Sequence, residues 1–446
     1  MKKYFKTHIL SALLVSFAVL ISCETDFDNP NAASGDEVFT SRDGLFSATV
    51  GMTQIYSVSG LRQIIETPAI TTREGGITTT FQNMIELEDG GANLPNFNSN
   101  VIGLWSNLLR VMGIAEDIAA NAPNVSLDAG TQSALIAYAN LFRAMSIGSL
   151  SQNFEQVVIL TSPNNDASFV SRQAGFTEAI RLLEEAKTLL AANPVSDEFE
   201  SVILKGNIDL LNTINAMLAR YNLFAGNYDA AISAANLVDQ SSGSVFTYDT
   251  QNPNPVWGRV FQNNAPNFKP RDNFGLPDSF VFDAEDGRVS FYLEELDETN
   301  QNGLPIEDLA APFFQTDIVS IPVYLTDEMN LIVAEANLRK ASPDTAAAIT
   351  AIDAVRTDND DIFGVNANID AYSGDTSISA LLNEVYQNRR AELFLTGLSL
   401  EDSRRFGRPE PSTAPMIYTD ERNRNFYPYP DIERNSNPNT PADPSI

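Results

Sequence analysis

Apolar residues recur every three or four positions in several stretches of the chain, which is the spacing that gives an α-helix one apolar face. In residues 101–120 these positions are Leu104, Leu108, Val111 and Ala115. The same pattern returns along the sequence and predicts helices at residues 42–58, 101–120, 131–150, 173–192, 208–224, 228–240, 326–340, 343–356 and 378–395. The chain is therefore predicted to be mainly α-helical.

The clearest pair of predicted helices spans residues 208–224 and 228–240, with a tight break at Gly226 between them. Ala219 and Ala231 stand one on each helix, and small residues there let two antiparallel helices approach closely. This pair resembles a tetratricopeptide unit, in which small residues recur at those positions. A hairpin of another helical fold is the alternative. A lone unit of this type cannot bury its apolar face, so we expect other helices to stack on both sides.

A second hairpin of the same kind is predicted at residues 326–356. Ser342 is expected to cap its second helix, with Pro343 at the first helical position. The predicted fold class is all-α in the main. Tetratricopeptide-like helical hairpins would form a right-handed superhelical scaffold, with irregular loop-rich and minor β insertions.

Two long segments interrupt the helical pattern. Residues 59–100 are rich in Gly, Thr and Asn and are predicted as loop with short strands. Residues 241–322 hold many aromatic residues and several prolines, which preclude long helices. Long irregular segments inside a compact domain are usually functional or disordered. We therefore expect both segments to face a ligand.

The first residues have the features of a bacterial export signal. Lys2, Lys3 and Lys6 form a positive region, and residues 9–21 are apolar or small throughout but too short to span a bilayer. The aliphatic and small residues before Cys23 match the lipobox of bacterial lipoproteins, whose cysteine is lipidated before cleavage. Acidic residues follow at once, which resembles the surface-export signal of Bacteroidetes lipoproteins. A short membrane helix with an incidental cysteine is the alternative.

This signal predicts a division of the chain into a lipoprotein signal peptide at residues 1–22, a lipidated tether at 23–40 and a single domain at 41–446. Removal of the signal would discard His8 and three lysines, so the net charge would change from −30 to −33. The remaining chain would have no histidine and no free thiol. That excludes Ser–His and Cys–His nucleophiles and metal sites built on histidine or cysteine.

The acidic balance also limits the partners of the chain. Proteins that bind nucleic acids or anionic lipid headgroups do so through clustered Lys and Arg. A chain this acidic is therefore expected to bind neither. No stretch after the signal approaches 18 apolar residues, and the lipid at Cys23 is therefore the only membrane attachment that the sequence predicts.

Four separated segments resemble the SusD/RagB family of outer-membrane nutrient-binding lipoproteins of Bacteroidetes. The lipobox is the first. The others are residues 321–336 (IPVYLTDEMNLIVAEA), 388–407 (NRRAELFLTGLSLEDSRRFG) and 427–435 (YPYPDIERN), in the order in which that family has similar motifs. Phe406 stands where the family usually has tryptophan, and the usual closing motif is missing. These departures concern the subfamily and the ligand more than the fold.

The resemblance implies a non-enzymatic lipoprotein of the outer membrane, exposed at the cell surface and working without a cofactor. It also implies a partner, a TonB-dependent SusC-like β-barrel that the lipoprotein covers as a lid. The protein would capture an oligosaccharide or a peptide and deliver it to the barrel unchanged.

The charged residues of these motifs have a structural interpretation. Arginine–carboxylate pairs clamp a helix end to the chain that returns past it, and we assign this role to Arg389, Arg390, Glu392, Asp402, Arg404 and Arg405. Glu335 is expected to pair with an arginine or to face solvent. Residues 358–361 (DNDD) offer oxygen ligands but lack the glycine and glutamate of a calcium loop, so no metal site is predicted.

Sugars are bound by aromatic platforms with polar side chains around the rim, and the two irregular segments supply both. The first is predicted to contribute Arg73, Phe81 and Asn83, with Asn93, Phe97 and Asn98 as further candidates. The second is predicted to contribute Trp257, Phe261, Phe268 and Arg271, with Asn273 as a further candidate. Trp105 lies in a helical pattern and is expected in the core. The alternative is a loop whose aromatic residues merely pack onto the scaffold.

Two other functions stay open at this stage. A glycosidase needs two carboxylates at a suitable separation, and among 58 acidic residues some pair will meet that condition. A scaffolding lipoprotein that binds other proteins through tetratricopeptide grooves would share the helices. It would not explain the two aromatic, irregular segments.

Overall fold

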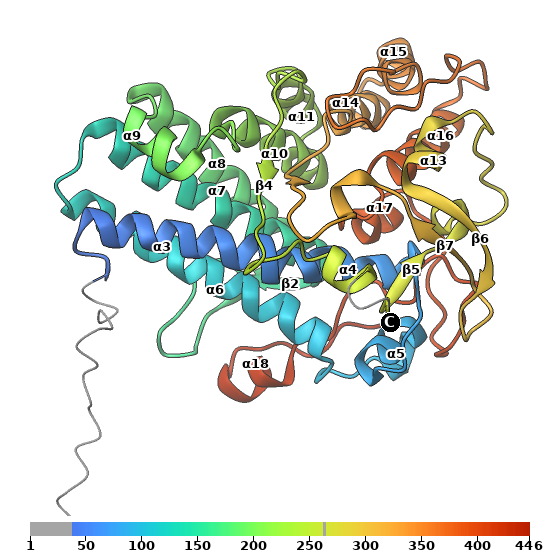
Figure 1. Ribbon diagram of the computed structural model, residues 1–446, viewed down its shortest axis with the longest axis horizontal. Helices are drawn as coiled ribbons and strands as arrows, with labels where there is room; N and C mark the ends of the chain where they lie inside the picture. The colour runs from blue at the N-terminus through green and yellow to red at the C-terminus, as the bar shows by residue number, and fades with distance from the viewer. Residues whose placement is uncertain (1–37, 262–264) are drawn as a thin grey trace, which may run out of the picture.

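The computed structural model describes residues 38–261 and 265–446 (Figure 1). The predicted signal peptide and Cys23 lie outside these residues. No helix in the described ranges is both long and apolar enough to cross a membrane.

Packed antiparallel helices form a continuous row through most of the chain (Figure 1). Each member contacts the next in the order α6, α7, α8, α10, α11, α14 and α15. Their bounds are α6 Ser99–Asn121, α7 Ala129–Asn153, α8 Arg172–Ala192, α10 Leu210–Ala225, α11 Tyr228–Ala235, α14 Glu328–Arg339 and α15 Thr345–Arg356. The predicted fold class, helical with tetratricopeptide-like hairpins that stack on one another, is confirmed.

Further helices lie beside the row. They are α3 Arg42–Gln54, α4 Leu61–Thr71, α5 Gln82–Asp89, α9 Asp197–Phe199, α12 Trp257–Val260, α13 Gly287–Tyr292, α16 Ile378–Glu392, α17 Ser399–Arg405 and α18 Asp431–Ser436. The chain from residue 407 onward is otherwise extended and returns across the start of the domain, where the Tyr427 hydroxyl meets the Thr71 hydroxyl at 2.8 Å.

The prediction of a loop over residues 59–100 is wrong for its first part and for α5. A π-helical turn at Ile55–Gly60 joins α3 directly to α4, so the chain stays helical as far as Thr71. Helix α4 is buried on nearly all sides, and its buried residues include the polar Gln63 and Glu66. Pro68 inside the helix and the Gly- and Thr-rich residues that follow it are why the sequence pattern was interpreted as a loop.

The predicted cap of α15 is also wrong. Asp344, not Ser342, is the N-cap, and its carboxylate accepts a hydrogen bond from the Ala347 N–H at 3.0 Å. Asp is as good an N-cap as Ser, so from the sequence alone either Ser342 or Asp344 could begin the helix. The backbone conformation decides that it is Asp344.

Small antiparallel strand pairs lie in and beside the irregular segments. Strand β1 Gly75–Ile77 pairs with β5 Phe268–Pro270, and β6 Leu293–Thr299 pairs with β7 Pro305–Leu309. A bridge between Arg271 and Ile306 links the two pairs. The remaining pairs join β2 Gln156–Val158 to β3 Phe169–Ser171, and β4 Val245–Phe246 to β8 Ile321–Pro322.

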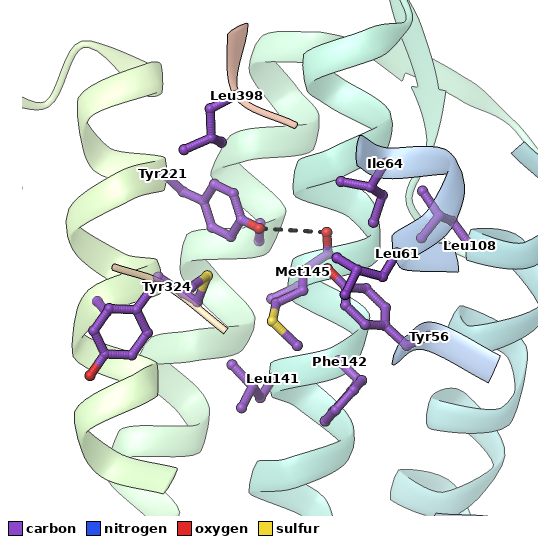
Figure 2. Packing of buried hydrophobic residues seen from close by; sticks show 14 of the residues in the cluster. Tyr56, Leu61, Ile64, Leu108, Leu141, Phe142, Met145, Tyr221, Tyr324 and Leu398 are labelled. Atoms are coloured by element: carbon purple, nitrogen blue, oxygen red, sulfur yellow. Dashed lines mark hydrogen bonds between the residues drawn. The ribbon is translucent and has the colours of Figure 1, made fainter. Parts of the chain in front are cut away.

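The core runs along the helical row as one large cluster of buried side chains. Figure 2 shows a part of it, where Tyr56 and Phe142 meet at a ring distance of 5.3 Å and Tyr221 of α10 lies against α7. The Tyr221 ring packs directly on the backbone of Gly148. A Cβ atom on residue 148 would overlap the ring, so only glycine allows this contact. Trp105 is buried in the same cluster, as predicted, and its indole N–H donates to Glu433 at 3.0 Å.

We expect Gly148→Ala to destabilise the protein by about 1–3 kcal/mol, because the added methyl group collides with the rigid Tyr221 ring. Gly51→Ala in α3 is the matched control. A Cβ there meets nothing within 4 Å, and Ala is a better helix former than Gly by about 1 kcal/mol. Urea unfolding midpoints of the two variants should therefore move in opposite directions. Equal shifts would contradict the close approach of α7 and α10.

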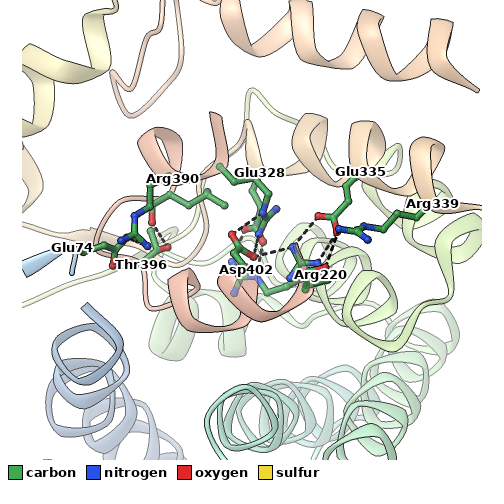
Figure 3. Close-up of polar contacts among 11 residues, drawn as sticks. Glu74, Arg220, Glu328, Glu335, Arg339, Arg390, Thr396 and Asp402 are labelled. Carbon is green, nitrogen blue, oxygen red and sulfur yellow. Dashed lines mark hydrogen bonds and ion pairs between the residues drawn. The ribbon is translucent and has the colours of Figure 1, made fainter. Parts of the chain in front are cut away.

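Buried ion pairs hold the C-terminal helices to the row (Figure 3). Asp402 of α17 accepts from Arg389 at 2.8 Å and from Arg405 at 2.8 Å. Glu335 of α14 accepts from Arg405 at 2.7 Å and from Arg339 at 2.7 Å. The predicted pairing of Glu335 with arginine is thus confirmed, and the arginine–carboxylate motif acts as a clamp between helices.

Candidate functional site

The two irregular segments lie side by side, as a shared ligand-facing surface requires. Strand β1 of the first pairs with β5 of the second, with Ile77 opposite Phe268. The pairing extends beyond the strands, since the Thr78 N–H donates to the Asn267 carbonyl at 3.0 Å and the Thr78 hydroxyl donates to the Pro266 carbonyl at 2.6 Å.

Helix α12 presents Trp257 and Phe261 next to this pairing. The Asn254 side chain accepts hydrogen bonds from the Val256 and Trp257 N–H groups and so starts the helix. Arg259 fastens it to α4 through an ion pair of 2.6 Å with Glu66, which is buried. Burial raises the pKa of Glu66 in spite of this arginine. Trp257 and Phe261 are both half-buried.

Two predicted contacts of the first segment also reach the surface. Phe81, just before α5, is 57 % exposed. Asn83 is half-buried, and its amide donates to the Asn100 side chain at 3.1 Å. Among the further candidates, Phe97 is exposed, whereas Asn98 is buried as the N-cap of α6.

Arg73 and Phe268 do not fit the prediction that they contact a ligand. Arg73 is 2 % exposed, and its guanidinium donates to the carbonyls of Glu88 at 2.9 Å, Ile417 at 3.0 Å and Asp420 at 3.3 Å. Burial lowers its pKa to about 10. Phe268 is 1 % exposed and packs over Gly75. Both side chains join the N-terminal segment to later parts of the chain instead.

Arg271 and Asn273 are partly exposed but already engaged. The Arg271 guanidinium donates to Asp272 at 3.2 Å. The Asn273 amide donates to the Leu276 carbonyl at 3.1 Å and to the Phe280 carbonyl at 2.9 Å, which closes the loop after β5. Asn273 therefore shapes the loop from within.

This loop encloses an open cavity of about 400 Å³, which we call the aromatic cavity. Apolar side chains form most of its wall: Phe274, Phe280, Val281, Phe282, Val289 and Leu293. Phe274 and Phe282 meet edge to face with ring centroids 4.9 Å apart. Asp278 and Asp283 add carboxylates to the same wall, and both are exposed.

Of the predicted contacts, only Asn273 lies in the wall of the aromatic cavity. The sequence prediction missed the other wall residues, which begin at Phe274, although the aromatic residues of the second segment were a signal for them. Arg390 of α16 holds the loop after β5 in place, because its guanidinium donates to the Phe274 carbonyl at 2.8 Å. Arg390 thus ties a motif residue to the cavity wall.

A second cavity of about 260 Å³ adjoins the first, and Val281, Phe282 and Asp283 line both. We call it the charged cavity, and the two together the ligand groove. Its other walls include two ion pairs, Arg288 with Asp286 at 2.7 Å and Arg356 with Glu384 at 2.6 Å.

Arg288 forms the buried floor of the charged cavity. It is 1 % exposed and also donates to the Asn388 side chain at 2.9 Å. Burial by itself lowers the pKa of Arg288, but the hydrogen bond and charge of Asp286 outweigh it and raise that pKa. The arginine therefore stays charged and paired, and it is no free cation for a ligand.

The described ranges contain no group of three or more acidic, histidine or cysteine residues placed to hold a metal ion. In the DNDD segment, the Asp361 carboxylate accepts from the Phe363 N–H at 2.8 Å and from the Thr326 hydroxyl. Its oxygens are committed to the loop itself.

Comparison with known proteins gives no match to any family sequence model or to any curated protein sequence. Solved structures do match. A SusD superfamily protein from Bacteroides vulgatus has a TM-score of 0.70 at 15 % identity, over 91 % of this chain and 99 % of that one. The chain has the SusD fold.

Two further structures with the SusD fold support this result. A SusD superfamily protein from Bacteroides thetaiotaomicron has a TM-score of 0.67 at 16 % identity, over 90 % of this chain and 99 % of that one. A SusD-like carbohydrate binding protein from Bacteroides fragilis has a TM-score of 0.66 at 14 % identity, with the same coverage. Identities this low show the fold alone, and the predicted resemblance to the SusD/RagB family is confirmed at that level.

Proposed function

We propose that the chain is a SusD-type surface lipoprotein that binds a nutrient glycan and delivers it, chemically unchanged, to a TonB-dependent SusC-like barrel. The observation that carries this proposal is a SusD fold over the whole described chain, with an open aromatic cavity in its loop-rich part. The description of one matched structure as carbohydrate-binding supports a glycan over a peptide.

The aromatic cavity suits the binding of a sugar. A pyranose ring has an apolar face that can lie on the half-buried Phe282 ring, while its hydroxyls donate to carboxylates at the rim. Asp278 and Asp283 supply those acceptors. The hydrogen bonds of Asn273 and Arg390 to the loop backbone hold the wall in place, so little loop order is lost when a ligand binds.

The attachment at the cell surface is inferred from the sequence alone. In this proposal Cys23 carries the lipid in the outer membrane, and the acidic tether after it leads to the domain. The large negative charge of the chain keeps such a body soluble close to the membrane.

We expect Phe282→Ala to weaken glycan binding about ten-fold, because a Phe side chain that covers a ligand contributes about 1–2 kcal/mol. Trp257→Ala is the matched aromatic comparison. Trp257 is a contact predicted from the sequence, but it does not line the aromatic cavity, so this variant should leave the affinity unchanged. A glycan array followed by calorimetry on both variants makes the measurement. A loss with Trp257→Ala alone would move the site to α12, and release of shortened glycan would favour the glycosidase.

A further inference from the structure

The walls of the ligand groove hold more acidic than basic side chains. Its walls hold four acidic side chains, Asp278, Asp283, Asp286 and Glu384, and two basic ones, Arg288 and Arg356. Both arginines are neutralised within the groove, Arg288 by Asp286 and Arg356 by Glu384. Two carboxylates, those of Asp278 and Asp283, are left without a cation.

These two carboxylates are available to a ligand. Within the described part of the chain no lysine or arginine forms an ion pair with either of them. Asp283 accepts a hydrogen bond from the Glu285 N–H at 3.0 Å through one oxygen, and its other oxygen is directed to no donor among the described residues. Both side chains are exposed at the wall of the aromatic cavity, beside Phe280, Val281 and Phe282.

A cation in this position gains from two sources at once. Each unpaired carboxylate attracts it, and the attraction is stronger beside an apolar wall than in open water. The net charge of −30 attracts cations to the surface and repels anions over a longer range.

We propose that the ligand groove selects an amino sugar. Its ligand is a glycan whose ring lies on Phe282 and whose protonated primary amine lies between Asp278 and Asp283, and anionic glycans such as polyuronates are excluded. The inference rests on the proposed glycan-binding function and names the glycan class. A basic peptide has the same cationic chemistry, but the wide apolar wall beside the carboxylates suits the flat face of a sugar ring better than a flexible lysine side chain.

The test compares two trisaccharides with the same backbone, the trimer of glucosamine and the trimer of N-acetylglucosamine. Calorimetry uses the purified full-length chain in mild detergent at low salt. We expect the amine trimer to bind about ten-fold more tightly than the acetylated one, since each carboxylate contributes up to about five-fold. The preference should shrink in high salt, and a trimer of galacturonic acid should bind more weakly than either.

Isosteric variants assign the preference to the two carboxylates. Asp278→Asn and Asp283→Asn should each lower the ratio of the two affinities about three-fold, and the double variant should remove the preference. Asp229→Asn on α11 makes the same change in net charge on an exposed residue of another element, so it should leave the ratio as it is.

The outcomes separate this inference from the proposed function. Equal affinities for the amine and acetylated trimers would overturn the amino-sugar inference and leave glycan binding intact. Binding of oligolysine without binding of either trimer would overturn both and identify a peptide receptor. The absence of binding to all three trimers and to a wider glycan array would likewise overturn both.

Discussion

Replacing Arg220 with methionine is expected to lower the free energy of unfolding by about 3–5 kcal/mol. The Arg220 guanidinium in α10 and the Glu328 carboxylate at the start of α14 form a two-pronged pair, with Nε–Oε1 at 2.7 Å and the second contact at 2.5 Å (Figure 3). Glu328 is 1 % exposed in its side chain, and Arg220 is its only ion-pair partner among the described residues. The variant therefore leaves a buried negative charge unpaired.

The Arg220 guanidinium is stable in the interior only because it is paired with Glu328. Burial lowers the pKa of Arg220, but the adjacent Glu328 carboxylate outweighs it and raises that pKa. The cation is thus held in the interior by its partner. Because α10 and α14 belong to successive hairpins, the loss weakens the contact between two units of the helical row.

Two controls make this prediction specific, both read from urea or thermal unfolding. Adding Glu328→Gln to Arg220→Met removes the unpaired charge and should recover most of the lost stability. Arg181→Met removes an arginine that also pairs with two glutamates but is 55 % exposed in its side chain. It should cost less than about 1 kcal/mol. If Arg220→Met were as mild as Arg181→Met, the pair would not join the hairpins.

Cys23→Ser is expected to remove the protein from the outer-membrane fraction. The lipobox prediction makes the Cys23 thiol the attachment point of the acyl chains, and a serine hydroxyl cannot form the thioether. Stable anchoring of a surface protein takes more than one acyl chain, and the variant has no acyl chain to hold it in the outer membrane. Because lipidation precedes cleavage, the variant also keeps its signal peptide.

Fractionation of cells, with labelling by a radioactive or clickable fatty acid, measures this effect. Ser22→Ala keeps a small residue before the cysteine and serves as the matched control, which should stay labelled and membrane-bound. A Cys23→Ser protein that remained with the outer membrane would show that something other than the lipid attaches the chain.

The sequence predicted the helices of the row because their apolar residues recur at helical spacing. Helices α6, α7 and α8 carry apolar residues at helical spacing, so each was found within three residues of its ends. Helix α4 was missed because Pro68 lies inside it and because the residues that follow it are rich in Thr and Gly, which are typical of loops.

The candidate site was predicted by region and not by residue. Proline and aromatic content located the second segment, but burial of a given ring depends on what packs on it. Phe268 lies under β1 because Gly75 leaves room for it, and Arg73 is covered by residues more than 300 positions later in the chain. Such contacts have no local signal, so the sequence did not distinguish the buried Phe268 from the half-exposed Phe282.

The central claim, that the chain works as the binding partner of a SusC-like barrel, is tested most directly by purifying the tagged protein from outer membranes in mild detergent. We expect a TonB-dependent barrel to co-purify with the wild-type chain in a fixed stoichiometry. The Cys23→Ser variant, which lacks the lipid that holds it in the outer membrane, should bring down far less of it. A membrane-anchored wild-type chain that is recovered without any barrel would contradict the account.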